Sequence, residues 1–599
     1  MKGVIDYKNI YEMLEKTYKE NPGKTGFRWV LNDRGDMGSV TWKEFHEQTL
    51  AVSKGLIKLG VKKGDRVAIV SYTSYKWVLC DIGSVSIGAG VVGIYHSLLA
   101  DDCKYILNHS ETKVVFVEDE EQLQKILSIK KKIPFVEKVI LLEGEYTGKV
   151  KNWVLSFEEF MEKGETVKDS TLDKMIKSVK PGDIASIVYT SGTTGLYKGV
   201  MLTHDNIIFT SQIINKFMPV QETDETLLFL PMAHIFARLD MYTTIFSNIT
   251  LSFCRSIETV VDDLQIIRPH WFPSVPRVFE KIYIRIRDGV EEKGGVVKLL
   301  FNRALKTGYR VSQLQLEKKK IPPLLALRYR IAMKLVFTKI HEALGGRVRF
   351  CVSGAAPMNP EVTRFFHAAG LIILEGYGMT ENTSFTNCTT VDDIKFGSVG
   401  HHAPEIEQKI ADNGEILFRG RNVMKGYYKM RKETKETITK DGWLHTGDIG
   451  FVDSQGRLTI TGRLKDIIIT SGGKNIAPSR IESFLGTSKF INQACVVGDS
   501  RKYLAALVTL NADNVVKFAK KRNIQFEHID DLNNNEVVRG LIQEEVNKAN
   551  EKLASFETIK RFSIVPEFTI ESGLLTPTMK PKRNEVMKRY AELIESLYE

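Results

Sequence analysis

A loop rich in glycine and hydroxyl residues holds the densest group of chemically useful side chains. It follows an apolar, β-branched run at 184–189 and contains Thr190, Ser191, Gly192, Thr193, Thr194, Gly195 and Lys198. Glycines allow backbone N–H groups to approach a ligand closely, hydroxyls donate hydrogen bonds, and the lysine adds positive charge. We therefore expect this loop to hold phosphate oxygens. The alternative is a flexible turn between two strands.

The spacing of this loop excludes the Walker A motif, in which Gly-Lys-Ser/Thr opens directly into a helix. Lys198 comes three residues after Gly195, and Gly199 follows it in place of a hydroxyl residue. Residues 200–202 have strand character, and Thr203 is suited to cap a helix over 205–217. We therefore reject a P-loop nucleotidase.

A second loop with ligand-binding side chains follows the apolar run at 371–374. It contains Gly376, Tyr377, Gly378, Thr380 and Glu381. The ring of Tyr377 offers a flat face to adenine, and Thr380 can donate to a phosphate oxygen. Glu381 suits Mg²⁺, which commonly binds through one or two carboxylates plus substrate phosphates. A surface turn with an incidental glutamate is the alternative for this loop taken alone.

The strand at 348–353 precedes a tight turn made by Gly354, Ala355, Ala356 and Pro357. Ligands of open α/β sheets bind where strands end, at their carboxyl edge. The turn after this strand and the loop after residue 374 are two consecutive exits of that kind. We therefore expect both to face one site, together with the glycine- and hydroxyl-rich loop.

The elements that must position these loops alternate along the first 180 residues. Strand-like runs at 66–72, 91–94, 113–117 and 138–142 are interspersed with helical stretches at 42–59, 102–108 and 120–130. This alternation predicts an open α/β sheet with helices on its faces. From residue 414 the pattern changes to short strands and turns, which predicts a small β-barrel-like subdomain.

The fold class we expect is therefore α/β, with two domains of unequal size. Residues 1–462 would form the large N-terminal domain of α/β sheets, and residues 463–599 a small α+β C-terminal domain. The boundary falls at Gly462 and Arg463, after which strands and polar helices alternate over an ordinary domain length.

Charge and composition limit the classes of partner. The chain is 43% hydrophobic and 26% charged, with a net charge of +11. This positive charge suits nucleotides, CoA phosphates or an acidic lipid surface. No nucleic-acid-binding module is visible and the basic residues are spread along the chain, so we expect no nucleic-acid partner.

Cysteine spacing and hydropathy indicate a reducing compartment. The six cysteines lie far apart in mostly apolar surroundings, which predicts buried free thiols. The first eight residues lack the apolar segment of a signal peptide, and no run is long enough for a transmembrane helix. We expect a cytoplasmic protein. The run Lys318, Lys319 and Lys320 is either a solvated helix end or a contact to anionic lipid on the inner membrane face.

Five stretches in order resemble the motifs of the adenylate-forming (ANL) superfamily. They are residues 184–200, 227–238 with His234, 375–381, 443–448 ending in Asp448, and the tail 574–583 with Lys580. Two residues depart from the family pattern. Tyr197 stands where proline is usual, and Met579 precedes the lysine where glycine is common.

The resemblance implies a role for each matching residue. Tyr377 and the turn 354–356 would hold adenine, Asp448 and Arg463 the ribose, and the loop 190–198 the β- and γ-phosphates, with Mg²⁺ on Glu381. His234 would lie beside the reacting carboxylate, and Lys580 would bridge that carboxylate and the α-phosphate. The small domain would be mobile and rotate about Lys465, so that Gly472 and Gly473 line a channel for CoA.

Residues 273–283 resemble the corresponding stretch of long-chain fatty acyl-CoA synthetases. This likeness implies a long-chain fatty acid–CoA ligase that converts a fatty acid to acyl-AMP and then to acyl-CoA, with ATP, Mg²⁺ and CoA. Two alternatives remain open. One is an acyl-AMP ligase that loads a carrier protein. The other is a catalytically silent, nucleotide-binding protein that docks on membranes, which we would expect to lack Glu381 or Lys580.

Overall fold

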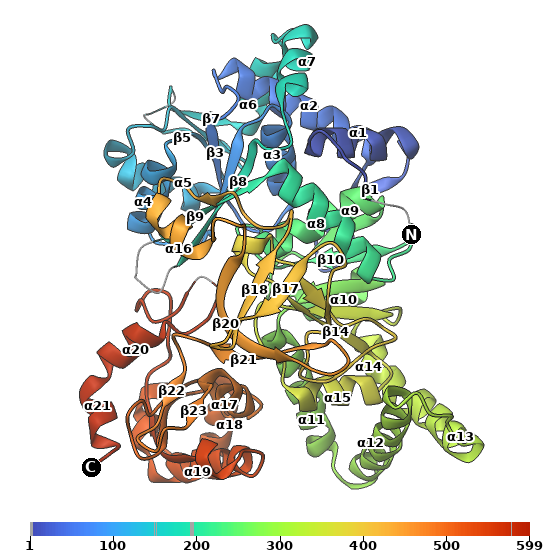
Figure 1. Cartoon of the computed structure of the whole chain (residues 1–599), viewed down its shortest axis with the longest axis vertical. Helices are drawn as coiled ribbons and strands as arrows, with labels where there is room; N and C mark the ends of the chain where they lie inside the picture. Colours follow the sequence, from blue (N-terminus) through green and yellow to red (C-terminus); the bar gives the residue numbers. More distant parts are fainter. Residues whose placement is uncertain (1–3, 149, 151, 192–196, 577) are drawn as a thin grey trace.

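Two large sheets and several small ones organise the chain in the computed structural model (Figure 1). The structure describes residues 4–148, 150, 152–191, 197–576 and 578–599. The N-terminal two thirds carry both large sheets, and the C-terminal residues form a separate body at one end.

The first large sheet has eight strands in the order β19-β9-β8-β4-β3-β5-β6-β7. Their bounds are β3 Arg66–Val70, β4 Gly90–Ile94, β5 Thr112–Val117, β6 Lys138–Leu141, β7 Val154–Ser156, β8 Ile184–Ser191, β9 Tyr197–Thr203 and β19 Gly426–Tyr427. Strands β3 to β8 pair in parallel, whereas β9 pairs antiparallel with β8 and β19. The parallel core confirms the alternating strand and helix pattern of the sequence.

The second large sheet has nine strands in the order β16-β15-β14-β13-β12-β10-β11-β1-β2. Their bounds are β1 Thr25–Val30, β2 Met37–Thr41, β10 Glu225–Leu228, β11 Thr250–Phe253, β12 Trp271–Ser274, β13 Phe350–Ser353, β14 Ile372–Tyr377, β15 Asn387–Cys388 and β16 His401–His402. Strands β10 to β14 run parallel, so their carboxyl ends lie at one edge.

Helices cover both sheets. In the first 220 residues they are α1 Ile10–Glu20, α2 Trp42–Lys58, α3 Tyr75–Ser86, α4 Ala100–Ser110, α5 Glu120–Ile129, α6 Phe157–Gly164, α7 Asp169–Ser178 and α8 His204–Phe217. Local sequence explains where several begin. The Thr41 hydroxyl at the start of α2 accepts a hydrogen bond from the Glu44 backbone N–H, and the Glu44 carboxylate accepts one from the Thr41 backbone N–H in return. Thr203 caps α8, as its position in the sequence predicts.

The middle of the chain adds α9 Ile235–Ser247, α10 Val260–Ile267, α11 Pro276–Lys293, α12 Gly295–Leu316, α13 Pro323–Ala332, a π-helical turn Met333–Phe337, α14 Thr338–Ala343, α15 Pro360–Ala368 and α16 Arg431–Thr437. Residues 276–332, which are rich in Lys and Arg, thus form three successive helices. Gly294 takes a positive φ between the first two, and Pro322 and Pro323 start the third.

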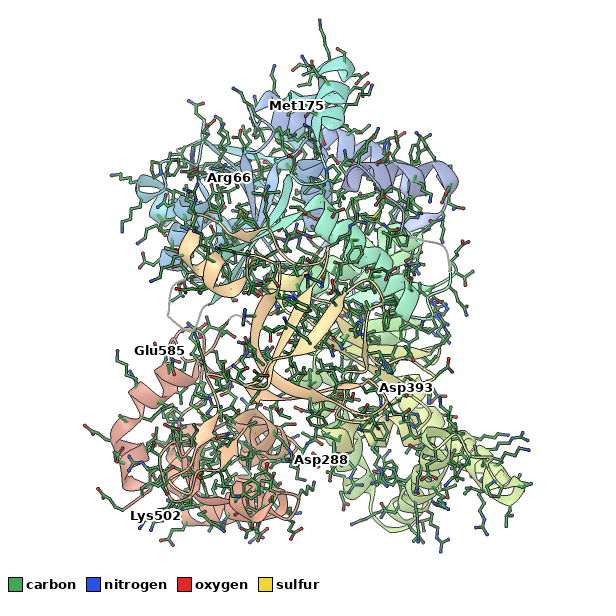
Figure 2. The ribbon with its side chains drawn as sticks, viewed as in Figure 1. Arg66, Met175, Asp288, Asp393, Lys502 and Glu585 are labelled. Carbon is green, nitrogen blue, oxygen red and sulfur yellow. The ribbon has the colours of Figure 1, made fainter. Side chains whose placement is uncertain are left out.

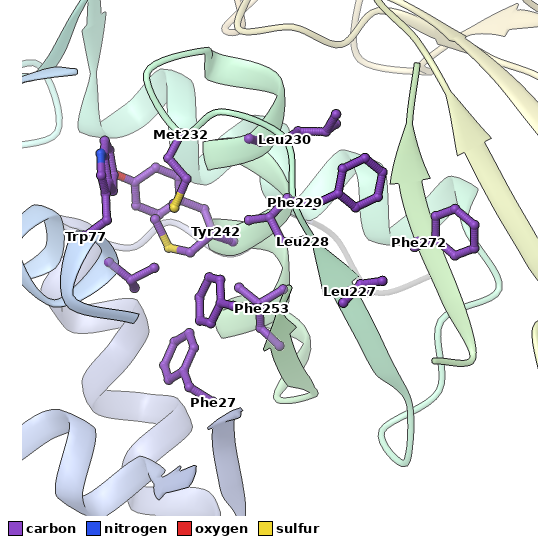
Figure 3. Packing of buried hydrophobic residues seen from close by; sticks show 14 of the residues in the cluster. Phe27, Trp77, Leu227, Leu228, Phe229, Leu230, Met232, Tyr242, Phe253 and Phe272 are labelled. Atoms are coloured by element: carbon purple, nitrogen blue, oxygen red, sulfur yellow. The ribbon is translucent and has the colours of Figure 1, made fainter. Parts of the chain in front are cut away.

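The core between the two large sheets is built from aromatic and aliphatic side chains of several elements (Figure 3). Phe27 of β1 packs edge-on against the Trp42 ring at 5.3 Å between centroids and lies near Phe253 of β11. Leu227 and Leu228 of β10 are fully buried in the same cluster. This shared core holds the two sheets in one body.

The short strands after residue 406 form a four-stranded antiparallel sheet in the order β17-β18-β20-β21. Their bounds are β17 Glu407–Ile410, β18 Glu415–Arg419, β20 Leu444–Val452 and β21 Leu458–Arg463. At one end of β21 the backbone of Leu458 exchanges hydrogen bonds with Val399 and Gly400, just before β16, so this small sheet is joined to the second large sheet.

The C-terminal body has its own buried clusters. Its strands are β22 Ile468–Ile469, β23 Asn475–Ile476, β24 Ile491–Val497, β25 Leu504–Leu510 and β26 Ile559–Ile564, and its helices are α17 Pro478–Leu485, α18 Ala512–Lys521, α19 Glu536–Asn550, α20 Arg583–Arg589 and α21 Ala591–Ser596. The strand β26, parallel to β25, was not expected from the sequence.

All six cysteines are free and buried, as their apolar surroundings predict. Among the described helices, none combines the length and apolar character that crossing a bilayer requires.

Candidate active site

A large cleft of about 3360 Å³ runs between the N-terminal sheets and the C-terminal body. Its walls include the ends of β8, β13 and β14, the turn before α9, and strands β20 and β21. The sequence-predicted residues that line it are Thr190, Lys198, His234, Ala355, Ala356, Gly376, Tyr377, Gly378, Thr380, Glu381, Asp448, Arg463, Lys465 and Lys580. Residues from all five widely separated motifs therefore meet in one space.

Asp448 is held from two sides within this cleft. The Tyr377 hydroxyl donates to its Oδ2 at 2.6 Å, and Arg463 Nε donates to its Oδ1 at 2.8 Å. Burial, followed by the neighbouring Asp448 carboxylate, raises the pKa of the Tyr377 phenol well above its ordinary value. The phenol therefore stays protonated and orients the carboxylate, which is free to accept further hydrogen bonds.

Glu381 lies at a second corner of the cleft with a partner that the sequence did not reveal. Tyr427 of β19 donates its hydroxyl to Glu381 Oε1 at 2.7 Å, and Lys198 Nζ lies 5.1 Å from the centre of the Tyr427 ring. One tyrosine thus joins the loop lysine and the carboxylate, with the ring face attracting the ammonium. No local motif signals this pairing, because Tyr427 and Glu381 are 46 residues apart.

His234 caps α9 and presents one ring nitrogen to the cleft. Its Nδ1 accepts a hydrogen bond from the Phe236 backbone N–H at 3.1 Å, which places the ring proton on Nε2. Burial, with a smaller contribution from Lys580, lowers the pKa of His234 to about 4. The imidazole is therefore neutral at pH 7, and Nε2–H is a donor suited to a carboxylate or phosphate oxygen.

Lys580 reaches from the C-terminal tail into the site of the N-terminal domain. Its ammonium donates to the backbone carbonyl of Ala355, 225 residues away in the chain. Desolvation and the nearby Arg463 lower the pKa of Lys580, while Asp448 opposes the shift. The lysine therefore stands next to the groups that hold Asp448.

Met579, just before this lysine, has a φ of +60°. Side chains other than glycine rarely adopt this left-handed conformation, because the Cβ crowds the following carbonyl. The family pattern of glycine before the lysine thus matches the backbone geometry. Met579 adopts the same turn with its side chain 61% exposed.

Polar contacts join the two domains in this arrangement. Arg277 of α11 donates to the backbone and side-chain oxygens of Asn492, both at 2.8 Å, and to the Gly486 carbonyl at 3.3 Å. Farther along α11, Asp288 pairs with Lys489 at 3.0 Å; Figure 2 labels Asp288 where the helix faces the C-terminal domain. The sequence motif containing Arg277 was expected to mark substrate class, and this domain contact was not foreseen.

A fully buried ion pair supports the helix that carries His234. Arg238 of α9 donates to the Asp81 carboxylate of α3 and to the Ser186 hydroxyl of β8. Tyr242 donates to the other oxygen of Asp81 at 2.6 Å. The network connects β8 to α9, so the strand that enters the glycine- and hydroxyl-rich loop has a fixed position relative to His234.

Several predicted residues lie outside the main cleft. Gly354 lines a small second cavity of about 40 Å³ behind the turn, beside Trp271 and Asp240. Gly472 and Gly473 form the turn between β22 and β23. Ser191 ends β8, and the predictions for Gly192, Thr193, Thr194 and Gly195 fall outside the described residues.

The side chains present fit a nucleotide with Mg²⁺. Within the described ranges, no group of three or more His, Cys, Asp or Glu side chains could hold a metal ion alone. Mg²⁺ that is shared with substrate phosphates needs only one or two carboxylates. Glu381, 8% exposed and oriented by Tyr427, meets that requirement.

Two family models match the chain. Residues 14–428 match the AMP-binding enzyme family, and residues 465–599 match the AMP-binding enzyme C-terminal domain.

Similar proteins span almost the whole chain. A protein named long-chain-fatty-acid–CoA ligase FadD15 from Mycobacterium bovis is 34% identical over 99% of this chain and 98% of its own length. Long chain acyl-CoA synthetase 7, peroxisomal, from Arabidopsis thaliana is 34% identical over 97% of this chain and 85% of its own. The adenylation domain of a carboxylic acid reductase from Segniliparus rugosus, solved with AMP and a carboxylic acid, has a TM-score of 0.77 at 21% identity, covering 99% of this chain and 94% of that domain.

Proposed function

The chain belongs to the AMP-binding enzyme family, and from that premise we propose that it is an ATP-dependent long-chain fatty acid–CoA ligase. Such an enzyme converts a fatty acid to acyl-AMP with release of pyrophosphate, and then transfers the acyl group to CoA with release of AMP. The names of the full-length relatives support the substrate class.

One observation carries the proposal. The ammonium of Lys580 enters the N-terminal site and bonds to Ala355, in the turn proposed to hold adenine. A cation at that position suits the first half-reaction, in which negative charge gathers between the carboxylate and the α-phosphate. The intact Glu381 and Lys580 also favour an active enzyme over a silent nucleotide-binding protein.

In the first half-reaction the residues position two anions. A carboxylate oxygen of the fatty acid forms a bond to the α-phosphorus of ATP as the bond to pyrophosphate breaks. Lys580 and the neutral His234 would hold the reacting oxygens, and Asp448 with Arg463 the ribose. Lys198 and Thr190 would contact the β- and γ-phosphates. Bound Mg²⁺ supplies positive charge to the phosphates, and Glu381 would hold it.

No general base is required in this step, because the nucleophile is already a carboxylate. The work of the protein is therefore orientation and charge neutralisation. Tyr377 would have two roles: its ring would stack on adenine, and its hydroxyl would orient Asp448 by a hydrogen bond.

In the second half-reaction the thiol sulfur of CoA bonds to the acyl carbon, AMP leaves, and the thiol proton is released. We propose that the small domain, residues 463–599, rotates about Lys465 between the two steps. Lys580 would leave the site, and Gly472 and Gly473 would face the arm of CoA. The domains are joined by separate polar contacts, such as that of Arg277 with Asn492, and contacts of this kind can break and re-form when two domains rotate.

The partners proposed are a fatty acid, CoA and the surface of an anionic membrane, which would seat the protein peripherally on the cytoplasmic side. Free fatty acids partition into bilayers, so a ligase near that surface meets its substrate at high local concentration.

Exchange of labelled pyrophosphate into ATP tests the proposal. We expect exchange to depend on a fatty acid across a panel of graded chain length, with a maximum among the long chains. Adding CoA should then yield acyl-CoA and AMP. Exchange without consumption of free CoA would instead indicate a ligase that loads a carrier protein, and no exchange with any acid would refute the proposal.

A further inference from the structure

The net positive charge of the protein resides in one helical segment, residues 293–341, which we call the basic segment. It contains twelve of the 84 Lys and Arg residues but only one of the 73 Asp and Glu residues, Glu317. The rest of the chain therefore has 72 residues of each sign and no net charge. Basic residues are spread along the sequence, as expected, but over the rest of the chain an equal number of acidic residues balances them.

All twelve of these basic side chains are exposed. Among the described residues, only Lys298 and Lys319 have a carboxylate within 4 Å, those of Glu291 and Glu317. The charge of the basic segment thus faces solvent largely without compensation, and it creates a local positive potential that attracts anionic surfaces.

An apolar stripe lies within the basic segment. Leu324, Leu327 and Ile331 of α13 and Leu335 of the π-helical turn are 61%, 54%, 51% and 62% exposed. A helix turns by about 100° per residue, so the first three fall within about 60° of one another. Exposed leucine and isoleucine gathered on one helix face mark a contact surface. We call these four residues the α13 stripe.

The opposite face of α13 is anchored to the protein. Ala332 and Phe337 are buried, and the Tyr329 hydroxyl donates to the Ala368 carbonyl of α15 at 3.2 Å. Figure 1 shows α13 at the edge of the molecule, beyond α12 and away from the C-terminal body. The stripe therefore points away from the packed side on a helix that the fold holds firmly.

We propose that the α13 stripe and the surrounding basic side chains dock on an anionic lipid bilayer. The four apolar side chains would enter the interface while Arg328, Lys334 and Lys318–Lys320 meet the headgroup phosphates. The positive charge around the α13 stripe favours an anionic bilayer over other occupants of this surface. A second copy of the chain would oppose two positive surfaces, and a nucleic acid would satisfy the charge but gain nothing from four exposed aliphatic side chains. An acidic protein would need an apolar patch of matching shape, whereas an anionic bilayer offers negative charge and an apolar interior together.

This inference names the surface for the membrane contact in the proposed function. Its benefit to the enzyme rests on that function, because fatty acids reside in bilayers. The charge and exposure of the basic segment do not depend on catalysis, so docking is measurable on its own.

Flotation of the full-length protein with vesicles tests the inference. We expect binding to phosphatidylcholine vesicles that contain phosphatidylglycerol, weakened by salt, and little binding to pure phosphatidylcholine. The pair Leu327→Ser and Ile331→Ser should weaken binding by about ten-fold or more, as should Lys318→Gln with Lys319→Gln and Lys320→Gln.

Matched controls lie on the C-terminal body. Val537→Ser removes an apolar side chain that is 47% exposed on α19, and Lys520→Gln with Lys521→Gln removes two charges from α18. Both controls should bind vesicles as the parent does. An unchanged melting temperature verifies the fold of every variant.

Two readouts separate this inference from the proposed function. Stripe variants should retain fatty-acid-dependent pyrophosphate exchange with the shortest acid that supports it, without vesicles. Vesicle binding without any exchange would refute the ligase but leave docking intact. Docking is overturned if the parent does not bind, if neutral and anionic vesicles bind equally, or if the variants bind like the parent. A dimer dissolved by the stripe variants, without vesicle binding, would also overturn it.

Discussion

Tyr377 and Asp448, 71 residues apart in the sequence, form a 2.6 Å hydrogen bond inside the cleft. They come from different sheets, β14 and β20, and each belongs to a separate sequence motif. The bond aligns a flat aromatic face with an acceptor carboxylate, which are the two features that recognition of a nucleoside requires.

Replacing Tyr377 with Phe should weaken nucleotide binding while keeping the ring. Asp448 would lose one of two partners, and a hydrogen bond to a charged group contributes about 1.5–3 kcal/mol. We expect the KM for ATP to rise by about ten-fold or more, with a smaller change in kcat. Tyr503→Phe is the matched control, since its hydroxyl bonds to the Leu597 carbonyl in the C-terminal domain. Equal kinetics for the two variants would contradict the role of Tyr377.

Replacing Lys580 with Ala should abolish the pyrophosphate-forming half-reaction. Loss of a preorganised cation at developing negative charge typically costs about 10²–10³ in rate. Formation of thioester from preformed acyl-AMP should be spared, because that step does not use Lys580. Lys582→Ala, two residues away, is the comparison and should lose much less exchange activity. Equal loss of both half-reactions in Lys580→Ala would refute the assignment.

Replacing Arg277 with Ala should affect the first half-reaction through the position of the small domain. The guanidinium makes three hydrogen bonds to the C-terminal body in the arrangement that places Lys580 in the site, and the proposed rotation would break them. We expect pyrophosphate exchange to fall by about ten-fold, with thioester formation from acyl-AMP less affected. Arg501→Ala, which removes an ion pair to Glu595 within the C-terminal domain, should leave exchange unchanged.

His234 should show no ionisation in the pH–rate profile between about pH 5.5 and 8, because its pKa is lowered to about 4. Replacement of His234 by Asn tests the role of its Nε2–H group as a hydrogen-bond donor. Asn caps helices as well as any residue, so stability should be kept, whereas Ala should cost about 1 kcal/mol. Loss of exchange in a stable Asn variant would assign a role to Nε2–H, and full activity would refute it.

Glu375 offers a test of stability against pH. Burial raises the pKa of this β14 carboxyl from its ordinary 4.5 to about 8, although Thr363 donates to it at 3.4 Å. A raised pKa means that its contribution to stability is full below pH 4.5 and is lost as the pH rises to about 8.

Relative to Glu375→Gln, the parent should therefore lose about 1.4 kcal/mol of unfolding free energy per pH unit across that window. Urea unfolding at several pH values measures the difference. Glu145→Gln, on an exposed loop, is the control and should track the parent. A constant difference at every pH would mean that Glu375 is not protonated in the folded protein.

The sequence by itself was sufficient for the motif chemistry and for most of the helices and strands, although not for β26. Alternating apolar runs predicted the parallel strands, Thr203 predicted the start of α8, and Tyr377, Glu381 and Lys580 were identified by type and order. These features depend on local periodicity, on helix capping and on side-chain chemistry. Each of these is determined by residues that lie close together in the sequence.

Only the tertiary structure decided which side chains contact one another across the fold. Tyr427 on Glu381, Arg277 on Asn492 and Arg238 on Asp81 join residues from 46 to 215 positions apart. Such pairs depend on which strands become neighbours and on how two domains meet, and no spacing in the chain encodes that.

The same division applies to the basic segment. The sequence contains its charge and its leucines, but a leucine at helical spacing is usually a core residue. Only the packing of α13 on α12, with Ala332 and Phe337 turned inward, decides that the other face and its apolar stripe remain in solvent. Burial is set by the whole fold, because a side chain leaves water only where another element arrives to cover it.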